Sequence, residues 1–130
     1  MVVFDTEAIL IFYFGEEGAD NVENLLIKIQ KGEEKGFMNV INLTEFYYIL
    51  YRKNPEIADE KVQNLKAYGI EFVPVLDDEI WREAGKIKAE YAIPLADAFA
   101  AATAIIKQDE LVAGNDRDFE NLGIPLLRLR

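Results

Sequence analysis

The sequence predicts an α/β fold, a three-layer α/β/α sandwich around a mostly parallel central sheet. Short, dense runs of apolar residues alternate with longer stretches in which apolar residues recur at helical spacing. Strands that alternate with helices in this way form parallel sheets that are covered on both faces. The length of 130 residues is typical of one domain, so we expect a single domain over 1–130.

The first part of the chain is expected to contain two strands and four helices. Residues 1–4 form a dense apolar run typical of a buried strand, and a short helix over 9–14 ends near two glycines. Apolar residues at helical spacing over 22–29, with acids before lysines, favour a second helix. A strand over 37–41 and helices over 43–52 and 55–68 follow. Pro55 suits the start of the last helix, and Gly69 suits its end.

The remaining part is expected to supply three strands and the helices between them. Residues 70–76 read as a strand, and Pro74 favours a sheet edge or a strand end. Asp77 is suited to cap the next helix, which carries apolar residues as far as Ile87. An alanine-rich helix over 95–107 is apolar almost all round, as buried helices are. Strands over 111–113 and 125–129 complete the sheet, with a short helix near Phe119 between them.

The chain contains no cysteine and no histidine, which narrows its chemistry. Without cysteine there is no disulfide, thiolate metal site or cysteine nucleophile, and the cytoplasm is the expected compartment. Without histidine the usual general base and transition-metal ligand are missing. Catalysis must therefore use carboxylates, hydroxyls, amides, lysine or arginine, and carboxylates favour hard cations. No apolar run reaches the roughly 18 residues of a membrane span, so no membrane association is expected.

The balance of charge is strongly acidic, with 24 acids against 14 bases and a net charge of −10. This balance argues against a broad basic surface for nucleic acid. Solubility and acids gathered to hold a cation would both account for it.

Acids follow several of the expected strands. Asp5 ends the first strand, Glu45 is expected in the first helical turn after the second, and Asp116 and Asp118 follow the fourth. Asp97 lies in the first turn of the alanine-rich helix. Because sites in open α/β sheets form outside the carboxyl ends of the strands, we expect these acids to converge on one edge.

Each acid also has a purely structural interpretation. Asp5 could cap the helix after it, and Asn-Leu-Thr-Glu over 42–45 has the spacing of a capping box that would explain Glu45. Asp116 and Asp118 could be ordinary turn residues. Asp97 is hardest to explain in this way, because its neighbours are apolar and no basic residue lies within one helical turn. Carboxylates that converge repel one another unless a cation neutralises them, so together they favour a divalent-cation site.

Four segments carry a family resemblance through their order and spacing: Val2-Val-Phe-Asp-Thr6, Asn42-Leu-Thr-Glu45, Leu95-Ala-Asp-Ala-Phe-Ala-Ala-Ala102 and Leu111-Val-Ala-Gly-Asn-Asp-Arg-Asp-Phe119. Together they resemble the PIN-domain nucleases, in particular the small VapC-like toxins, over essentially the whole chain. The resemblance implies a PIN-like fold, hydrolysis of RNA phosphodiesters, a homodimer and a cognate antitoxin. It also implies that Asp5, Glu45, Asp97 and Asp116 surround a Mg²⁺ or Mn²⁺ site.

The resemblance further implies individual roles for the acids. Asp5 and Asp97 would hold the first ion, and Glu45 and Asp116 would complete the ring directly or through water. Asp118 also matches the family pattern but ranks fifth, because its side chain is expected to point away from the metal. The number of ions stays open.

One position departs from the family pattern. The family usually has Thr or Ser where this chain has Gly114, so a hydroxyl that could orient an acid or a water is missing. Thr6 and Asn42 are candidates to supply such contacts, and Asn115 is a further candidate site residue. We expect the departure to affect the rate more than the metal site.

Basic and aromatic side chains are weaker candidates for RNA contacts. The basic candidates are Arg117 beside the acidic turn and Arg52 and Lys53 at a helix end, with Arg82, Lys86 and Lys88 on another helix. A solvated helix face explains each of them better than a contact with RNA does. Five aromatic residues could stack on bases, although their helical spacing suits core or dimer packing better: Phe12, Tyr13, Tyr47, Tyr48 and Tyr51.

Three rival functions fit the sequence less well. A phosphoacceptor receiver domain needs an acid pair after the first strand, and a haloacid-dehalogenase-like phosphatase needs Asp-x-Asp there, whereas this chain has Asp5-Thr-Glu7. The stronger rival is a catalytically silent PIN-like module that binds RNA or protein. Such a module would be marked by lost acids, and this chain keeps all four. The RNA that is cut and the antitoxin stay open.

Overall fold

The computed structural model describes residues 1–114 and 116–129, and for Asp116 it describes the backbone only. The elements follow in the order β1 (Val2–Phe4), α1 (Thr6–Phe14), α2 (Ala19–Gln30), β2 (Gly36–Asn39), α3 (Val40–Lys53), α4 (Pro55–Tyr68), β3 (Glu71–Val73), α5 (Asp78–Glu90), α6 (Leu95–Lys107), β4 (Glu110–Ala113), η1 (Asp116–Asp118), η2 (Glu120–Leu122) and β5 (Leu126–Arg128).

The five strands form one sheet in the order β3-β2-β1-β4-β5, and every neighbouring pair is parallel. The expected fold class is thereby confirmed. The first three strands are added in one direction, and the chain then returns to place β4 on the other side of β1. The strand order therefore reverses between β1 and β4, and ligand sites of open α/β sheets form at such a point.

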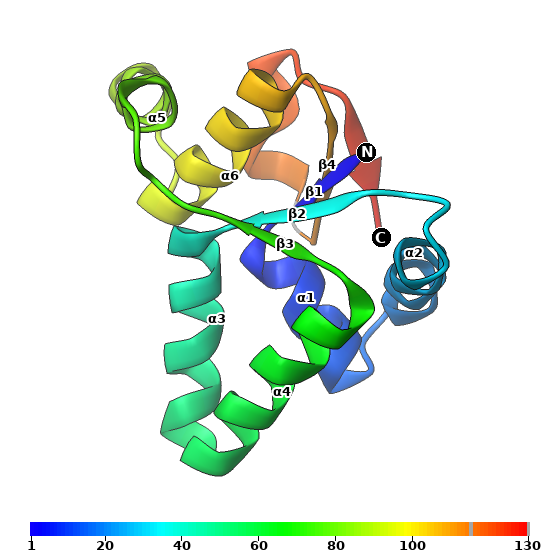
Figure 1. Ribbon diagram of the computed structural model, residues 1–130. Helices are drawn as coiled ribbons and strands as arrows, with labels where there is room; N and C mark the ends of the chain where they lie inside the picture. The colour runs from blue at the N-terminus through cyan, green and yellow to red at the C-terminus, as the bar shows by residue number, and fades with distance from the viewer. Residues whose placement is uncertain (115, 130) are drawn as a thin grey trace.

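Helices cover both faces of the sheet and make three layers (Figure 1). Helices α1 to α4 pack on one face, and α5 and α6 pack on the other. The strand residues alternate accordingly, as the pleat of a strand requires. Val2 and Phe4 belong to the apolar core on the α1–α4 side, whereas Val3 belongs to the core on the α5–α6 side. Strand β1 is thus buried on both faces, at the centre of the molecule.

Several helix ends follow the sequence signals closely. Helix α4 begins at Pro55 after the cap Asn54, and it ends before Gly69, whose φ of 103° is in the left-handed region. Asp77 caps α5, because its side chain accepts a hydrogen bond from the backbone amide of Glu79. Helix α6 has the predicted bounds. Pro74 follows the edge strand β3, in agreement with its expected place.

The boundary between the second strand and the third helix was predicted wrongly. Strand β2 ends at Asn39, and Asn39 is also the cap of α3, where its Oδ1 accepts a hydrogen bond 2.8 Å long from the amide of Ile41. The helix therefore begins three residues before the expected start. Asn42 and Glu45 lie inside α3, so the capping-box interpretation of Glu45 is wrong.

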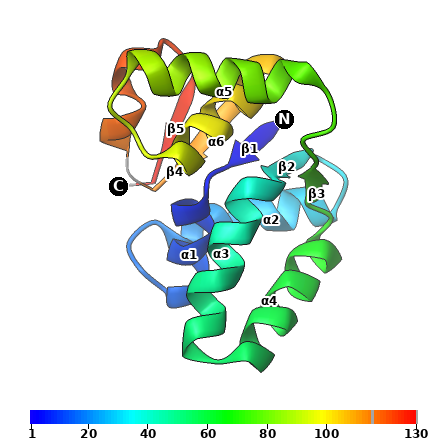
Figure 2. The ribbon, with the colours of Figure 1, turned by 90° about the vertical axis from the view of Figure 1, so that its left-hand side faces the viewer.

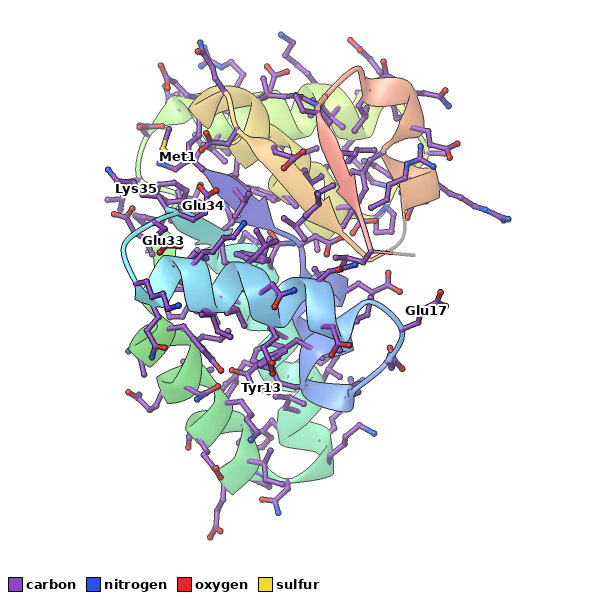
Figure 3. The ribbon with its side chains drawn as sticks, turned by 90° about the vertical axis from the view of Figure 1, so that its right-hand side faces the viewer. Met1, Tyr13, Glu17, Glu33, Glu34 and Lys35 are labelled. Carbon is purple, nitrogen blue, oxygen red and sulfur yellow. The ribbon has the colours of Figure 1, made fainter. Side chains whose placement is uncertain are left out.

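Two other features lie away from the carboxyl edge of the sheet. At the opposite edge, where β1 begins, the amino terminus pairs with Glu34, and Figure 3 shows Met1, Glu34 and Lys35 gathered there. On the α1–α4 side, Tyr13 reaches from α1 to α4, and its hydroxyl donates a hydrogen bond to Asn64 Oδ1 (Figure 3).

No helix in the described part of the chain combines the length and apolarity that a membrane crossing requires.

Candidate active site

Asp5 lies at the carboxyl end of the central strand and is only 2% exposed. Its Oδ1 accepts a hydrogen bond 2.7 Å long from the backbone amide of Ala8, so it is the cap of α1. The structural interpretation of Asp5 is therefore confirmed. Capping alone does not require burial, however, because Asn54 and Asp77 cap their helices although both are exposed.

Burial raises the pKa of Asp5 from 3.8 to about 7. Hydrogen bonds from the backbone amides of Ala8 and Gly114 oppose the increase, and the negative charges of Glu7 and Glu45 add to it. The Asp5 carboxyl is therefore unstable as an anion unless positive charge comes close to it.

Asp97 lies in the first turn of α6, where no side chain caps the helix. Partial burial raises its pKa, and a hydrogen bond with Asp118 and the charges of Asp5, Asp118 and Glu45 raise it further. Because two carboxylates cannot hydrogen-bond without a proton, the Asp97 carboxyl donates to Asp118 in its protonated form. The side chain is thus surrounded by acids rather than by a basic partner.

Asp97 and four other acids line a depression of about 430 Å³ at the carboxyl edge of the sheet, whereas the buried Asp5 is not among its lining residues. Ten residues line it: Thr6, Glu7, Leu10, Phe14, Glu16, Glu45, Ile49, Pro94, Asp97 and Asp118. Helix α3 contacts both α1 and α6, so acids from all three helices reach one place (Figure 2). The depression carries five acidic side chains, and none of the residues that line it is basic.

Asp118 occupies a different place from the one expected. It lines the depression and lies within hydrogen-bond reach of Asp97, although its side chain was expected to point away from the metal. The short 3₁₀ helix η1 turns it back toward the start of α6. Asn115 and the side chain of Asp116 lie outside the described residues.

Thr6 and Asn42, the candidates for polar contacts, are both buried and bond to each other. Asn42 Nδ2 donates to Thr6 Oγ1 at 3.3 Å and to the carbonyl of Ala96 at 3.0 Å, while Thr6 Oγ1 donates to the carbonyl of Asn42 at 3.2 Å. Their hydrogen bonds in this structure join helices rather than reaching a carboxylate.

Gly114 has no room for the hydroxyl residue that the family pattern carries. A Cβ at this position would lie 2.5 Å from Glu7 Cγ and 2.8 Å from Ile11 Cδ1. The side chain of Glu7 therefore fills the space beside Gly114, and its carboxylate adds negative charge near Asp5.

Sequence reasoning missed Glu7 and Glu16 as site residues. The acidic Asp-Thr-Glu sequence at the start of α1 was the only sequence signal for Glu7. Its contact with Gly114 could not be predicted, because the two residues are far apart in the chain.

The basic candidates divide between paired residues and residues near the site. Arg82 and Lys86 pair with acids of their own helix, Asp78 and Glu83. Arg52 lies over the ring of Tyr48, with Cζ 4.9 Å from its centroid, and Lys53 lies over Phe14, with Nζ 5.4 Å from its centroid. Because Phe14 also lines the depression, Lys53 is the basic candidate that the structure connects to it. Arg117 is exposed on η1.

The aromatic candidates are mostly packed. Phe12 and Tyr13 pack against the core of the α1–α4 side, and Tyr47 is half-buried and donates a hydrogen bond to Asp59. Tyr48 and Tyr51 are 42% and 51% exposed on α3.

The donor set fits a hard divalent cation. Among residues 1–114 and 117–129, no three carboxylates are already close enough to form a complete ion site. The available ligands are all carboxylate oxygens, which Mg²⁺ and Mn²⁺ prefer, and the pKa values of Asp5 and Asp97 are raised by burial and by neighbouring carboxylates. A cation that bound between them would relieve both effects.

Structures of several complexes contain chains of the same fold. A chain of the DNA-bound VapBC complex from Salmonella typhimurium is 22% identical with a TM-score of 0.77, and covers 99% of this chain and 98% of its own length. A chain of VapBC2 from Rickettsia felis, bound to a promoter DNA fragment, is 17% identical with a TM-score of 0.78 and full coverage of both chains, 100% each. A chain of a toxin-antitoxin complex from Klebsiella pneumoniae is 17% identical with a TM-score of 0.75, and covers 98% of this chain and 96% of its own.

Sequence comparison gives the family directly. No curated protein sequence matches the chain significantly. The family model described as PIN domain matches residues 2–125, which is nearly the whole chain. The match includes the strand that ends at Asp5, the helices that carry Glu45 and Asp97, and the turn that carries Asp118. The chain belongs to the PIN domain family.

Proposed function

We propose that this protein is a metal-dependent endoribonuclease that hydrolyses RNA phosphodiester bonds and is the toxin of a type II toxin-antitoxin pair. The observation that carries the proposal is the meeting of Asp5, Glu45, Asp97 and Asp118 at the point where the strand order reverses. Four structural segments contribute these acids, and no basic side chain neutralises them among the residues that line the depression. Membership of the PIN domain family supports the same function.

The cofactor that this donor set would hold is Mg²⁺ or Mn²⁺. Asp5 and Asp97 are the proposed primary ligands, with Glu45 and Asp116 completing the ring. When bound, such an ion lowers the pKa of a water that attacks phosphorus and stabilises charge on the leaving oxygen. In the absence of a cation, burial and a hydrogen bond with Asp118 raise the pKa of Asp97 and favour its protonated form. Asp97 and Asp118 would both offer carboxylate oxygens to such an ion once the Asp97 proton had passed to water.

Contacts with RNA are proposed for Lys53 and Arg117, with Arg52 as a further candidate. Lys53 contacts the ring of Phe14, whose side chain lines the depression, and Arg117 precedes Asp118 on η1. Because affinity for RNA grows with the number of phosphates that basic residues neutralise, a chain with a net charge of −10 should bind RNA weakly or selectively.

Protein partners follow from the same proposal. The structural relatives include complexes titled VapBC and a toxin-antitoxin complex, which supports an antitoxin partner for this chain. A homodimer is also proposed, and the exposed rings of Tyr48 and Tyr51 on α3 support a protein contact there. Light scattering of the purified chain, alone and with the product of a neighbouring gene, tests both partners.

The deciding experiment is cleavage of a mixed set of structured and single-stranded RNAs in Mn²⁺, Mg²⁺ or EDTA. Asp97→Asn removes the charge of one proposed ligand. Asp20→Asn is the matched control, because Asp20 also lies in the first turn of a helix but is exposed and does not line the depression. We expect metal-dependent cutting by the wild type and by Asp20→Asn, and none by Asp97→Asn. If the wild type neither cuts RNA nor binds Mn²⁺ in calorimetry, the nuclease proposal is wrong and a silent binding module remains.

A further inference from the structure

A buried side-chain amide joins α1 and α6, the helices whose first turns lie beside Asp5 and Asp97. Asn42, on α3, is 0% exposed, and its Nδ2 donates to Thr6 Oγ1 on α1 and to the carbonyl of Ala96 on α6. A third bond strengthens the connection, because Thr6 Oγ1 donates to the backbone carbonyl of Asn42. One side chain thus contacts the first turns of two helices that are far apart in the sequence.

The residues that Asn42 holds are the immediate neighbours of two acids. Thr6 follows Asp5, and Ala96 precedes Asp97. A shift of either helix along its axis would break one of these hydrogen bonds and would also change the separation of the two carboxyls. Since ionised Asp5 and Asp97 repel each other, the neutral bonds of Asn42 act against that repulsion.

A comparison within the same molecule distinguishes this amide from one that only supports the fold. Asn39 is also buried, and both ends of its amide are used, since Nδ2 donates to Thr103 Oγ1 at 2.9 Å and Oδ1 accepts from Ile41. Asn42 Oδ1, by contrast, is buried without a hydrogen-bond partner among the described residues. An unmet buried acceptor is unfavourable for stability, so a role in stability alone does not account for Asn42.

We propose that Asn42 is a positioning residue, whose bonds to Thr6 and Ala96 set the separation of Asp5 and Asp97 that a divalent cation requires. The proposal rests on the proposed function, because the acids must bind a cation for their separation to matter. Residues that orient metal ligands in this way typically change metal affinity by about 10- to 100-fold when they are replaced.

Matched threonine variants test this role. Thr6→Val keeps the shape of the side chain and removes the hydroxyl that bonds to Asn42, whereas Thr6→Ser keeps the hydroxyl. Thr103→Val is the control, because it removes the equivalent buried hydroxyl beside Asn39, away from the acids. Mn²⁺ binding is measured by calorimetry, RNA cleavage by kcat and KM, and the exchange of the Ala8 and Ala98 amides by NMR on the metal-free protein.

The expected result separates positioning from stability. Thr6→Val should raise the Kd for Mn²⁺ by about 10-fold or more, recover cleavage when Mn²⁺ is raised accordingly, and leave KM for RNA unchanged. Its Ala8 and Ala98 amides should exchange faster than in the wild type. Thr6→Ser and Thr103→Val should keep the wild-type Kd, although Thr103→Val loses stability.

Two outcomes would overturn the inference, and they differ. If the wild type binds Mn²⁺ but Thr6→Val and Thr103→Val have the same Kd, the amide only supports the fold while the nuclease proposal stands. If the wild type binds no Mn²⁺, the proposed function fails and the positioning role fails with it. Asn42→Leu, which removes the amide itself, checks that the effect belongs to Asn42.

Discussion

Replacing Asp5 by asparagine should stabilise the metal-free protein at neutral pH. A pKa raised from 3.8 to about 7 corresponds to about 4 kcal/mol of lost folding free energy at pH 8, at about 1.4 kcal/mol per pKa unit. Asp5→Asn removes this cost and keeps an oxygen for the amide of Ala8. It gives up one oxygen that the amide of Gly114 uses, at about 1 kcal/mol. We therefore expect a net gain of about 3 kcal/mol at pH 8.

The sign of the pH dependence follows from the direction of the pKa change. Because the native pKa of Asp5 is above the unfolded one, the native protein holds more protons between about pH 4 and pH 7. The wild type should therefore lose stability as pH rises through this range and lose no more above it. The gain from Asp5→Asn should be absent near pH 4, grow up to about pH 7 and then stay level.

Urea denaturation in EDTA, followed by circular dichroism at pH 4, 6 and 8, measures this difference. Asp20→Asn serves as the control, because Asp20 is exposed and its replacement should give a small difference at every pH. A difference between Asp5→Asn and wild type that does not change with pH would refute the reasoning. The same variant should bind no Mn²⁺, so that stability is gained where function is lost.

Three further predictions follow from contacts described above. Mn²⁺ should raise the Tm of the wild type but leave that of Asp97→Asn unchanged in differential scanning fluorimetry, since binding stabilises only the state that holds the ligands. An equal increase in both would place the ion elsewhere. Gly114→Ala should destabilise the protein by about 1–3 kcal/mol in urea, because the new Cβ meets Glu7 Cγ. The cost should shrink in a Glu7→Ala background, and a purely additive double variant would contradict this. Asn54→Ala should cost about 0.5–2 kcal/mol in urea, because Asn54 Oδ1 accepts bonds from two amides at the start of α4. A stability equal to wild type would show that this cap contributes nothing.

Local signals predicted the elements well where one residue decides a boundary. Pro55 and Gly69 delimit α4 because one suits a first turn and the other the left-handed conformation after the last turn. The start of α3 was missed because Asn39 and Asn42 are equally good caps as residue types. Tertiary burial decides between them, because Asn39 ends a strand and Asn42 is buried between α1 and α6, where it bonds to both.

The candidate site, too, could be predicted only in part from the sequence. The places of Asp5 and Asp97 at strand and helix ends could be predicted, because the rule for open α/β sheets depends only on the order of elements. The hydrogen bond between Asp97 and Asp118 could not be predicted, since it depends on how η1 turns after β4. Glu7 was missed for a similar reason, because only the packing of α1 against β4 brings it beside Gly114.

The position of β1 has a consequence for protein synthesis. Strand β1 lies at the centre of the sheet and precedes its neighbour β4 by more than a hundred residues of sequence, with Val2 paired to Glu110. A nascent chain that ends after β3 carries Asp5 and Glu45 but lacks both Asp97 and Asp118. The acidic site is therefore assembled only after α6 and η1 have been made and β4 has added beside β1. If the chain is the nuclease proposed above, a nascent chain that ends before α6 should not cut RNA.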